Sequence, residues 1–202
     1  MGKVTASYWD DKYKVEEFVY TKTENRFVVE YCSSLTPGRV IDLAGGEGRN
    51  SVWFAKRGWQ VENIDFSAVA LQKYADYAAA EGVAASCLAT VADAMEFVPQ
   101  MDEVDLGVIG YLQIPAGDLR KAIRRLASHV VSGGLLPLRG DQARSLARGR
   151  ATVEGDDAER ARAGVFGQRH RDDVHPGRGR LPRGPRRRRA RRATGRAADA
   201  DG

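Results

Sequence analysis

The hydrophobic and polar positions of residues 1–139 follow two periods that alternate along the chain. Short runs rich in β-branched residues predict buried strands, and longer stretches with apolar residues three or four apart predict helices. The predicted strands cover residues 39–44, 59–65, 85–92, 104–112 and 133–138. The predicted helices cover residues 23–35, 48–58, 68–82 and 116–131. Strands that alternate strictly with helices predict a doubly wound, Rossmann-like α/β fold with a mostly parallel sheet.

The pattern ends near residue 140, and the composition changes with it. Between residues 141 and 202, Gly, Ala, Arg and Pro account for 40 of 62 residues, and apolar periodicity is lost. Such a segment buries too little apolar surface to offset the entropy of ordering it. We therefore expect a folded core over residues 1–139 and a disordered tail over residues 140–202, so that the C-terminal strands of the sheet are missing or disordered.

The tail also changes how the net charge of +5 is interpreted. Residues 1–140 contain 15 basic and 18 acidic side chains, whereas residues 141–202 contain 17 basic and 9 acidic ones. Nucleic-acid binding is therefore expected only through the arginine-rich tail. A competing hypothesis is a reading-frame shift between about residues 134 and 170, because residues with GC-rich codons dominate abruptly where a fifth strand should lead onward.

A glycine cluster follows the first predicted strand. Gly45, Gly46 and Gly48 separate that strand from the next helix, and Asp65 ends the second strand. Glycines let the backbone approach a ligand closely, and a carboxylate at the neighbouring strand end can accept both hydroxyls of a ribose. The two features together predict a nucleoside-binding crevice.

Two positions bear on which nucleoside binds there. A dinucleotide fingerprint needs a third glycine, and Ser51 stands at that position. Asp42 lies inside the first strand, four residues before Gly46, where a carboxylate disfavours a pyrophosphate and favours a ligand with ammonium and sulfonium groups. The pattern favours S-adenosylmethionine (SAM) as the cofactor, with an NAD-linked oxidoreductase as a less favoured alternative.

Several segments, in the right order, carry a family resemblance. They are YWDDKYKVEEFVYTKTENRFVVEY (8–31), DLAGGEGRN (42–50), IDFS (64–67), VADAMEF (91–97), DLGVIGYLQIP (105–115) and VSGG (131–134). Together they resemble the class I SAM-dependent methyltransferases, in particular the small bacterial enzymes of the tellurite-resistance and thiopurine type. The resemblance implies an enzyme that transfers a methyl group from SAM to a small-molecule acceptor.

The resemblance also implies roles for individual positions. Asp42 and the backbone of residues 44–48 would face the methionine part of SAM. Asp65 would hold the ribose, Asp93 would accept from the adenine amino group, and the helices of residues 1–36 would form a lid. The implied cofactor-binding set is Tyr8, Trp9, Asp42, Ala44, Gly45, Gly46, Gly48, Arg49, Asp65, Phe66, Ser67, Asp93, Ala94, Ile109 and Tyr111.

Ordinary structural roles compete with some of these assignments. Asp93 can serve as a helix cap, and Tyr111 can simply pack at a strand end. Tyr8, Trp9 and Tyr13 can hold the first helix on the sheet without touching a ligand. No residue is identified as a catalytic base, because a methyl donor that is already electrophilic depends mainly on positioning.

Two departures from the family pattern stand out. Ala44 replaces a glycine, and Pro137 stands where the fifth strand needs a backbone donor. Class I enzymes also have two further strands, for which this sequence supplies no recognisable counterpart. The alternatives are therefore an inactive methyltransferase fold and a nucleic-acid-binding protein, and any turnover is expected to be weak.

The remaining features concern location and metals. There is no run of 18 apolar residues to predict a membrane span, and the N-terminus lacks the apolar segment of a secretory signal, so we expect a cytoplasmic protein. Cys32 and Cys87 are isolated within apolar patterns, as is typical of free thiols. The Cys and His spacing does not predict a metal site. The identity of the acceptor and the oligomeric state stay open.

Overall fold

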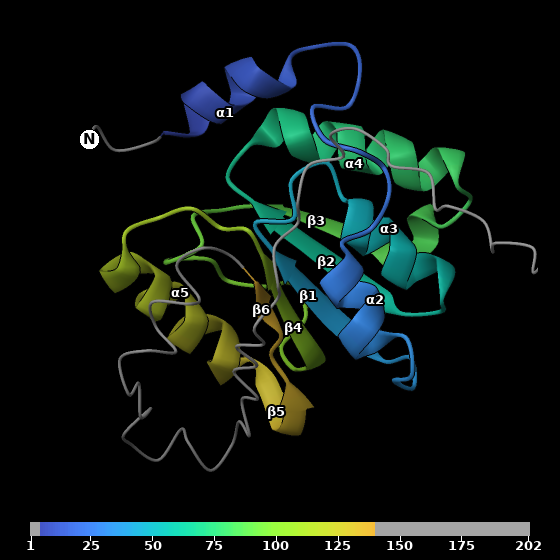
Figure 1. The fold of residues 1–202 in the computed structure, drawn as a ribbon, viewed down its shortest axis with the longest axis vertical. Helices are drawn as coiled ribbons and strands as arrows, with labels where there is room; N and C mark the ends of the chain where they lie inside the picture. Colours follow the sequence, from blue (N-terminus) through green and yellow to red (C-terminus); the bar gives the residue numbers. More distant parts are fainter. Residues whose placement is uncertain (1–4, 140–202) are drawn as a thin grey trace, which may run out of the picture. The chain divides into compact units, whose positions relative to one another are not determined.

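A computed structural model describes residues 5–139 of the chain (Figure 1). Its strands are β1 (Arg39–Leu43), β2 (Gln60–Asp65), β3 (Cys87–Val91), β4 (Val104–Gly110), β5 (Val130–Leu135) and β6 (Leu138–Arg139). Its helices are α1 (Ala6–Tyr13), α2 (Arg26–Cys32), α3 (Arg49–Lys56), α4 (Ala68–Ala80) and α5 (Ala116–Ser128), with a short 3₁₀ helix η1 (Ala84–Ser86). The predictions about residues 140–202, namely the disordered tail, its arginine-rich arm and the frame shift, lie outside the described residues.

The sheet is parallel, and its strand order is β3-β2-β1-β4-β5, with β6 also pairing with β4. The chain runs outward from β1 in one direction to β3 and then returns to β4 on the other side of β1. In open α/β sheets, ligands bind outside the carboxyl ends of the strands at such a switch point. The predicted doubly wound, Rossmann-like fold with a mostly parallel sheet is confirmed.

Alternate residues of each strand face opposite sides of the sheet. On β1, Val40 packs in a core with α2 and α3, whereas Ile41 and Leu43 pack in a second core that includes α5. Figure 1 shows α2, α3 and α4 on one side of the sheet and α5 on the other. Because Asp42 shares its face of β1 with Val40, its carboxylate lies on the α3 side.

The predicted fifth strand is divided into β5 and β6. Gly133 has a positive φ of 83° within β5, and the pairing with β4 shifts register between Val104 and Leu106. The Ile109 N–H donates to the Pro137 carbonyl oxygen at 3.1 Å. Pro137 therefore keeps its acceptor in the ladder but has no N–H to donate, which accounts for the break between the two short strands.

Several helix boundaries differ from the prediction by one to three residues. The helix expected from residue 23 begins at Arg26, with Asn25 as its N-cap, and the Asn25 backbone N–H donates to Asn50 Oδ1 at 2.9 Å. The helix expected to reach residue 131 ends at Ser128, because the β-branched Val130 enters β5 instead. Within residues 5–139, no helix combines the length and the apolar character needed to cross a membrane.

Candidate functional site

The loop between β1 and α3 has a left-handed backbone at three positions. Ala44, Gly46 and Gly48 have φ values of 57°, 57° and 81°. For Ala44, which carries a Cβ, this conformation costs about 1–2 kcal/mol, so tertiary contacts must hold it. One such contact is its N–H, which donates to the Ile64 carbonyl oxygen of β2 at 2.7 Å. The loop is therefore tied to β2 before Gly48 begins α3 as its N-cap.

Asp42 is buried next to this loop and is 1% exposed. Ser51 Oγ donates to Asp42 Oδ2 at 2.8 Å, whereas Asp42 Oδ1 is buried with no hydrogen-bond partner among the described residues. Burial raises the pKa of Asp42 to about 6, against the lowering influence of Ser51 and of the Arg49 charge. A buried carboxylate oxygen without a partner is a favourable position for a cationic group of a ligand.

Asp65 ends β2 on the other side of the loop. Its Oδ2 accepts from the Gly46 N–H at 3.0 Å, and its Oδ1 accepts from the Ser67 N–H at 2.9 Å. Burial raises the pKa of Asp65, although both backbone donors oppose the shift. Because each carboxylate oxygen can accept more than one hydrogen bond, Asp65 is oriented by the protein and still has lone pairs for a ligand.

Helix α1 covers this loop. Ser67 Oγ donates to Asp10 Oδ1 at 2.6 Å, which joins α1 to the start of α4. The Tyr13 side chain lies over the glycines, since a Cβ built on Gly46 would be 2.9 Å from the Tyr13 hydroxyl. Burial and the nearby Asp65 charge raise the pKa of Tyr13 above its ordinary value, so this hydroxyl stays protonated. The lid role predicted for the N-terminal helices remains a prediction, and α1 is the helix in position to perform it.

The other aromatic residues of the predicted set lie near the same edge of the sheet. Trp9 stacks on Tyr13 with 5.6 Å between ring centroids, whereas Tyr8 is 58% exposed. Phe66 is half-buried directly after β2. Tyr111 follows β4 with a positive φ of 62°, and its ring meets Phe27 edge-on at 6.3 Å. A tyrosine held at positive φ is strained, and such strain is typical of functional positions.

Four predicted side chains have contacts elsewhere. Ile109 is fully buried in the core that includes α5, so only its backbone lies at the strand end. Arg49 lies over the Tyr20 ring at 5.9 Å and lines a cavity of about 260 Å³ outside α3. Asp93 Oδ1 accepts from the Met95 N–H at 2.8 Å and so closes a turn over residues 94–96; the helix-cap role weighed against adenine binding is wrong, because no helix directly follows Asp93. Ala94, beside it, packs against the α5 core.

Sequence reasoning missed the role of Glu47. This residue is 5% exposed within the glycine loop, and its carboxylate accepts from the backbone N–H groups of Val19 and Tyr20 at 3.0 and 3.2 Å. Lys73 Nζ of α4 completes the group at 2.9 Å. Glu47 thus fastens the N-terminal segment to the glycine loop. A charged residue between glycines is the only sequence signal of this role, because its partners lie 26 or more positions away.

Asn63 was also missed. It is fully buried on β2 beside Asp42, its register partner on β1. Its Nδ2 donates to the Gly46 carbonyl oxygen at 3.1 Å, while its Oδ1 has no hydrogen-bond partner among the described residues. Two acceptors that lack a donor, one from each strand, therefore lie next to the glycine loop. In the part of the chain described, no cluster of His, Cys, Asp and Glu suits a metal ion.

Comparison with known proteins bears on the class of this site. Residues 40–134 match the family described as "Methyltransferase domain". A curated relative, "Ribosomal RNA small subunit methyltransferase C" of Alcanivorax borkumensis, is 45% identical over 47 residues, which are 23% of this chain and 14% of the relative. Similar solved structures include the glycopeptide N-methyltransferase MtfA complexed with SAM, at 24% identity and a TM-score of 0.47, covering 56% of this chain and 51% of that one. Another is the PH0226 protein of Pyrococcus horikoshii, at 20% identity and a TM-score of 0.47, covering 54% and 47%.

The family match covers the strands of the site and the helices between them, but it does not include α1 and α2. It runs from β1 to within β5 and includes the glycine loop, Asp65 and Asp93. Residues 40–134 thus match a methyltransferase domain, in agreement with the methyltransferase resemblance of the sequence motifs. The chain spans about half or less of the length of the relatives and structures cited above.

Proposed function

We propose that this chain binds SAM at the carboxyl ends of β1 and β2 and transfers its methyl group to a small-molecule acceptor. The observation that carries the proposal is a pair of buried carboxylates, Asp42 and Asp65, on adjacent strands with one left-handed glycine loop between them. A structural salt-bridge network does not account for the pair, because no basic side chain bonds to either carboxylate among the described residues. The carboxylates instead keep acceptor capacity for a ligand.

The residues of this edge fit the parts of SAM. The unpartnered Asp42 Oδ1 fits a cationic ammonium group, since an opposite charge lowers the cost of burying a carboxylate. Gly46 lacks a Cβ where the loop faces Tyr13 of α1, so a ligand beneath that helix could approach the backbone closely. The free lone pairs of Asp65 fit the hydroxyl donors of a ribose.

SAM supplies a methyl group that its positive sulfonium has already made electrophilic. The contribution of the chain is then to orient the donor and to keep water away from it. Asp42 and Asp65 would fix two separate parts of the cofactor. Helix α1 would cover it, with Trp9 and Tyr13 on the covering side.

Calorimetric titration with S-adenosylhomocysteine, compared with NAD, tests the cofactor. We expect saturable binding of S-adenosylhomocysteine and none of NAD. The variant Asp65→Asn should weaken binding about tenfold or more, since charge-assisted hydrogen bonds to the ribose are lost. The matched control Asp76→Asn, on an exposed position of α4, should bind as the unmodified chain does. Absence of S-adenosylhomocysteine binding would refute the proposal, and NAD binding would support the oxidoreductase alternative.

Transfer of a radioactive methyl group tests the acceptor. The chain is incubated with methyl-labelled SAM and either a panel of small thiols, amines, phenols and carboxylates or ribosomal RNA. We expect label in a small molecule. Label in RNA would contradict the small-molecule proposal and would agree with the acceptor named for the Alcanivorax relative. Cofactor binding without transfer to any acceptor would favour the inactive-fold alternative.

A further inference from the structure

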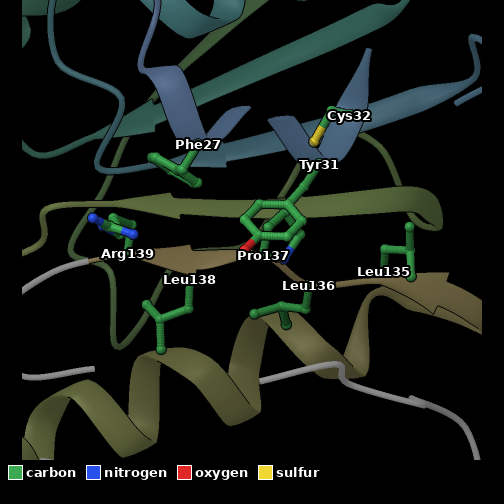
Figure 2. A pocket seen from close by; sticks show the side chains of 8 residues that line it. All are labelled: Phe27, Tyr31, Cys32, Leu135, Leu136, Pro137, Leu138 and Arg139. Atoms are coloured by element: carbon green, nitrogen blue, oxygen red, sulfur yellow. The ribbon is translucent and has the colours of Figure 1, made fainter. Parts of the chain in front are cut away.

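An apolar cavity of about 130 Å³ lies beside the proposed methyl-donor site rather than over it (Figure 2). One wall is formed by Phe27, Tyr31 and Cys32 of α2, and the other by residues 135–139 of β5, β6 and the link between them. Figure 2 shows the aromatic side chains of α2 facing this segment across β4. The two walls come from parts of the chain more than 100 residues apart.

The cavity is neutral except at one end. Leu135 packs with the α2 and α3 core, whereas Leu136 and Leu138 turn to the α5 core, as expected for alternate residues of an extended segment. Burial raises the pKa of the Cys32 thiol to about 12, so it remains uncharged at neutral pH. Among the described residues that line the cavity, Arg139 alone carries a formal charge.

The charged end lies next to the end of β4, where the glycine loop also is. The Tyr111 N–H donates to the Arg139 carbonyl oxygen at 2.7 Å, which sets the two residues side by side. A Cβ built on Gly110 would be 3.6 Å from the Phe27 ring and 3.5 Å from Asn50 Nδ2. Asn50 is the second residue of α3, directly after the glycine loop. The Phe27 end of the cavity is therefore linked to the cofactor loop through a single residue of β4.

The geometry points to this cavity as the site for the apolar part of the methyl acceptor, and to a ring-sized acceptor that carries an anionic group. The inference rests on the proposed function, because the cavity can receive a methyl acceptor only if SAM binds beside it. An apolar cavity of about 150 Å³ in another protein accommodates benzene, so a cavity of this size suits one ring. Arg139 at the end nearest the donor would pair with a carboxylate or a similar anion on that ring.

Fluorine NMR titration of the full chain with 4-fluorobenzoate and its neutral isostere 4-fluorobenzyl alcohol tests the inference. Each ring is titrated with and without saturating S-adenosylhomocysteine. We expect saturable binding of both rings, with the benzoate about fivefold tighter because of the arginine. The substitution Arg139→Gln should remove that preference, whereas Arg124→Gln, on an exposed position of α5, should keep it.

A second variant tests the cavity itself rather than its charge. Leu135→Phe places a larger side chain on the α2 side of the segment. It should weaken the binding of both ring compounds about fivefold or more, because the side chain partly fills the cavity. Retained binding of S-adenosylhomocysteine shows that this variant is folded. Should it lose that binding as well, Arg139→Gln and its control decide the matter by themselves.

The possible failures are distinguishable. If S-adenosylhomocysteine binds but neither ring saturates, the inference is overturned and the proposed function stands. If Arg139→Gln and Arg124→Gln show the same preference for the benzoate, the assignment of an anionic group to the acceptor is overturned. If S-adenosylhomocysteine does not bind at all, the proposed function fails, and the acceptor assignment fails with it even where the rings bind.

Discussion

The substitution Asp42→Asn separates the stability of this chain from its cofactor binding. Asp42 is 1% exposed and its pKa is raised to about 6 by burial, from an ordinary value of 3.8. An acid whose pKa is higher in the folded state binds its proton more tightly there. Its contribution to stability is therefore complete below about pH 3.8 and is lost as the pH rises through about 6.

The magnitude follows from the size of the shift. One pKa unit corresponds to about 1.4 kcal/mol, so the charged Asp42 lowers the free energy of unfolding at pH 7 by ~3 kcal/mol relative to pH 3.8. The new amide of Asp42→Asn has no charge to bury. Its carbonyl can still accept from Ser51, and its NH₂ group adds a donor where Asp42 Oδ1 and Asn63 Oδ1 both lack one.

Urea unfolding at a series of pH values measures the effect. We expect Asp42→Asn to be more stable than the unmodified chain by up to ~3 kcal/mol at pH 7, with the difference vanishing near pH 4. The same variant should bind S-adenosylhomocysteine about tenfold more weakly, because the ammonium group loses its carboxylate. The control Asp76→Asn should change neither quantity. A variant less stable at pH 7, or a stability difference that does not depend on pH, would refute the argument.

Three further predictions follow from local geometry. Gly48→Ala should lower the free energy of unfolding by about 3 kcal/mol, since the φ of Gly48 is 81° and a Cβ there collides with the Tyr74 ring. The control Gly82→Ala, at φ 73° with open space around it, should cost about 1 kcal/mol. Equal losses of the two variants in urea unfolding would contradict this. Glu47→Gln should cost about 1–3 kcal/mol and speed amide exchange at residues 19–20, as measured by hydrogen exchange, and unchanged protection there would argue against the anchoring role. Ser67→Ala removes the N-cap side chain of α4 and a hydrogen-bond donor to α1. It should lower the free energy of unfolding by about 1–2 kcal/mol and make α1 the first site of cleavage in limited proteolysis. Cleavage elsewhere first would argue against the contact between Ser67 and α1.

Features that depend on interactions between residues near in sequence were predictable, whereas features that depend on contacts between distant segments were not. The strands and helices from β1 to α5 follow from apolar periodicity, because a period of two or of 3.6 residues reports which face of an element is buried. The boundary errors were of the local kind. The helix predicted from residue 23 starts at Arg26, and Val130 belongs to β5.

Part of the candidate site could also be predicted from the sequence. Gly46, Gly48 and Asp65 stand at the ends of adjacent strands, and their order alone brings them to one edge of a parallel sheet. For Asp93, the sequence left a helix-cap role and an adenine role open, and in the structure its bond to the Met95 N–H closes a turn that no helix directly follows. The adenine role remains a prediction.

Other features depended on contacts between distant segments. Periodicity does not show that Glu47 binds the backbone of residues 19–20, that Tyr13 lies over Gly46, or that both Asp42 and Asn63 keep an acceptor without a partner. Nor does it show that α2 and residues 135–139 enclose a cavity beside β4. The sequence by itself determined the order of the elements and the edge of the sheet at which the glycine loop and Asp65 lie, because these depend on local burial and on chain order. Only the tertiary structure decided which side chains cover, anchor and adjoin that edge, because those contacts depend on how separately predicted elements pack against one another.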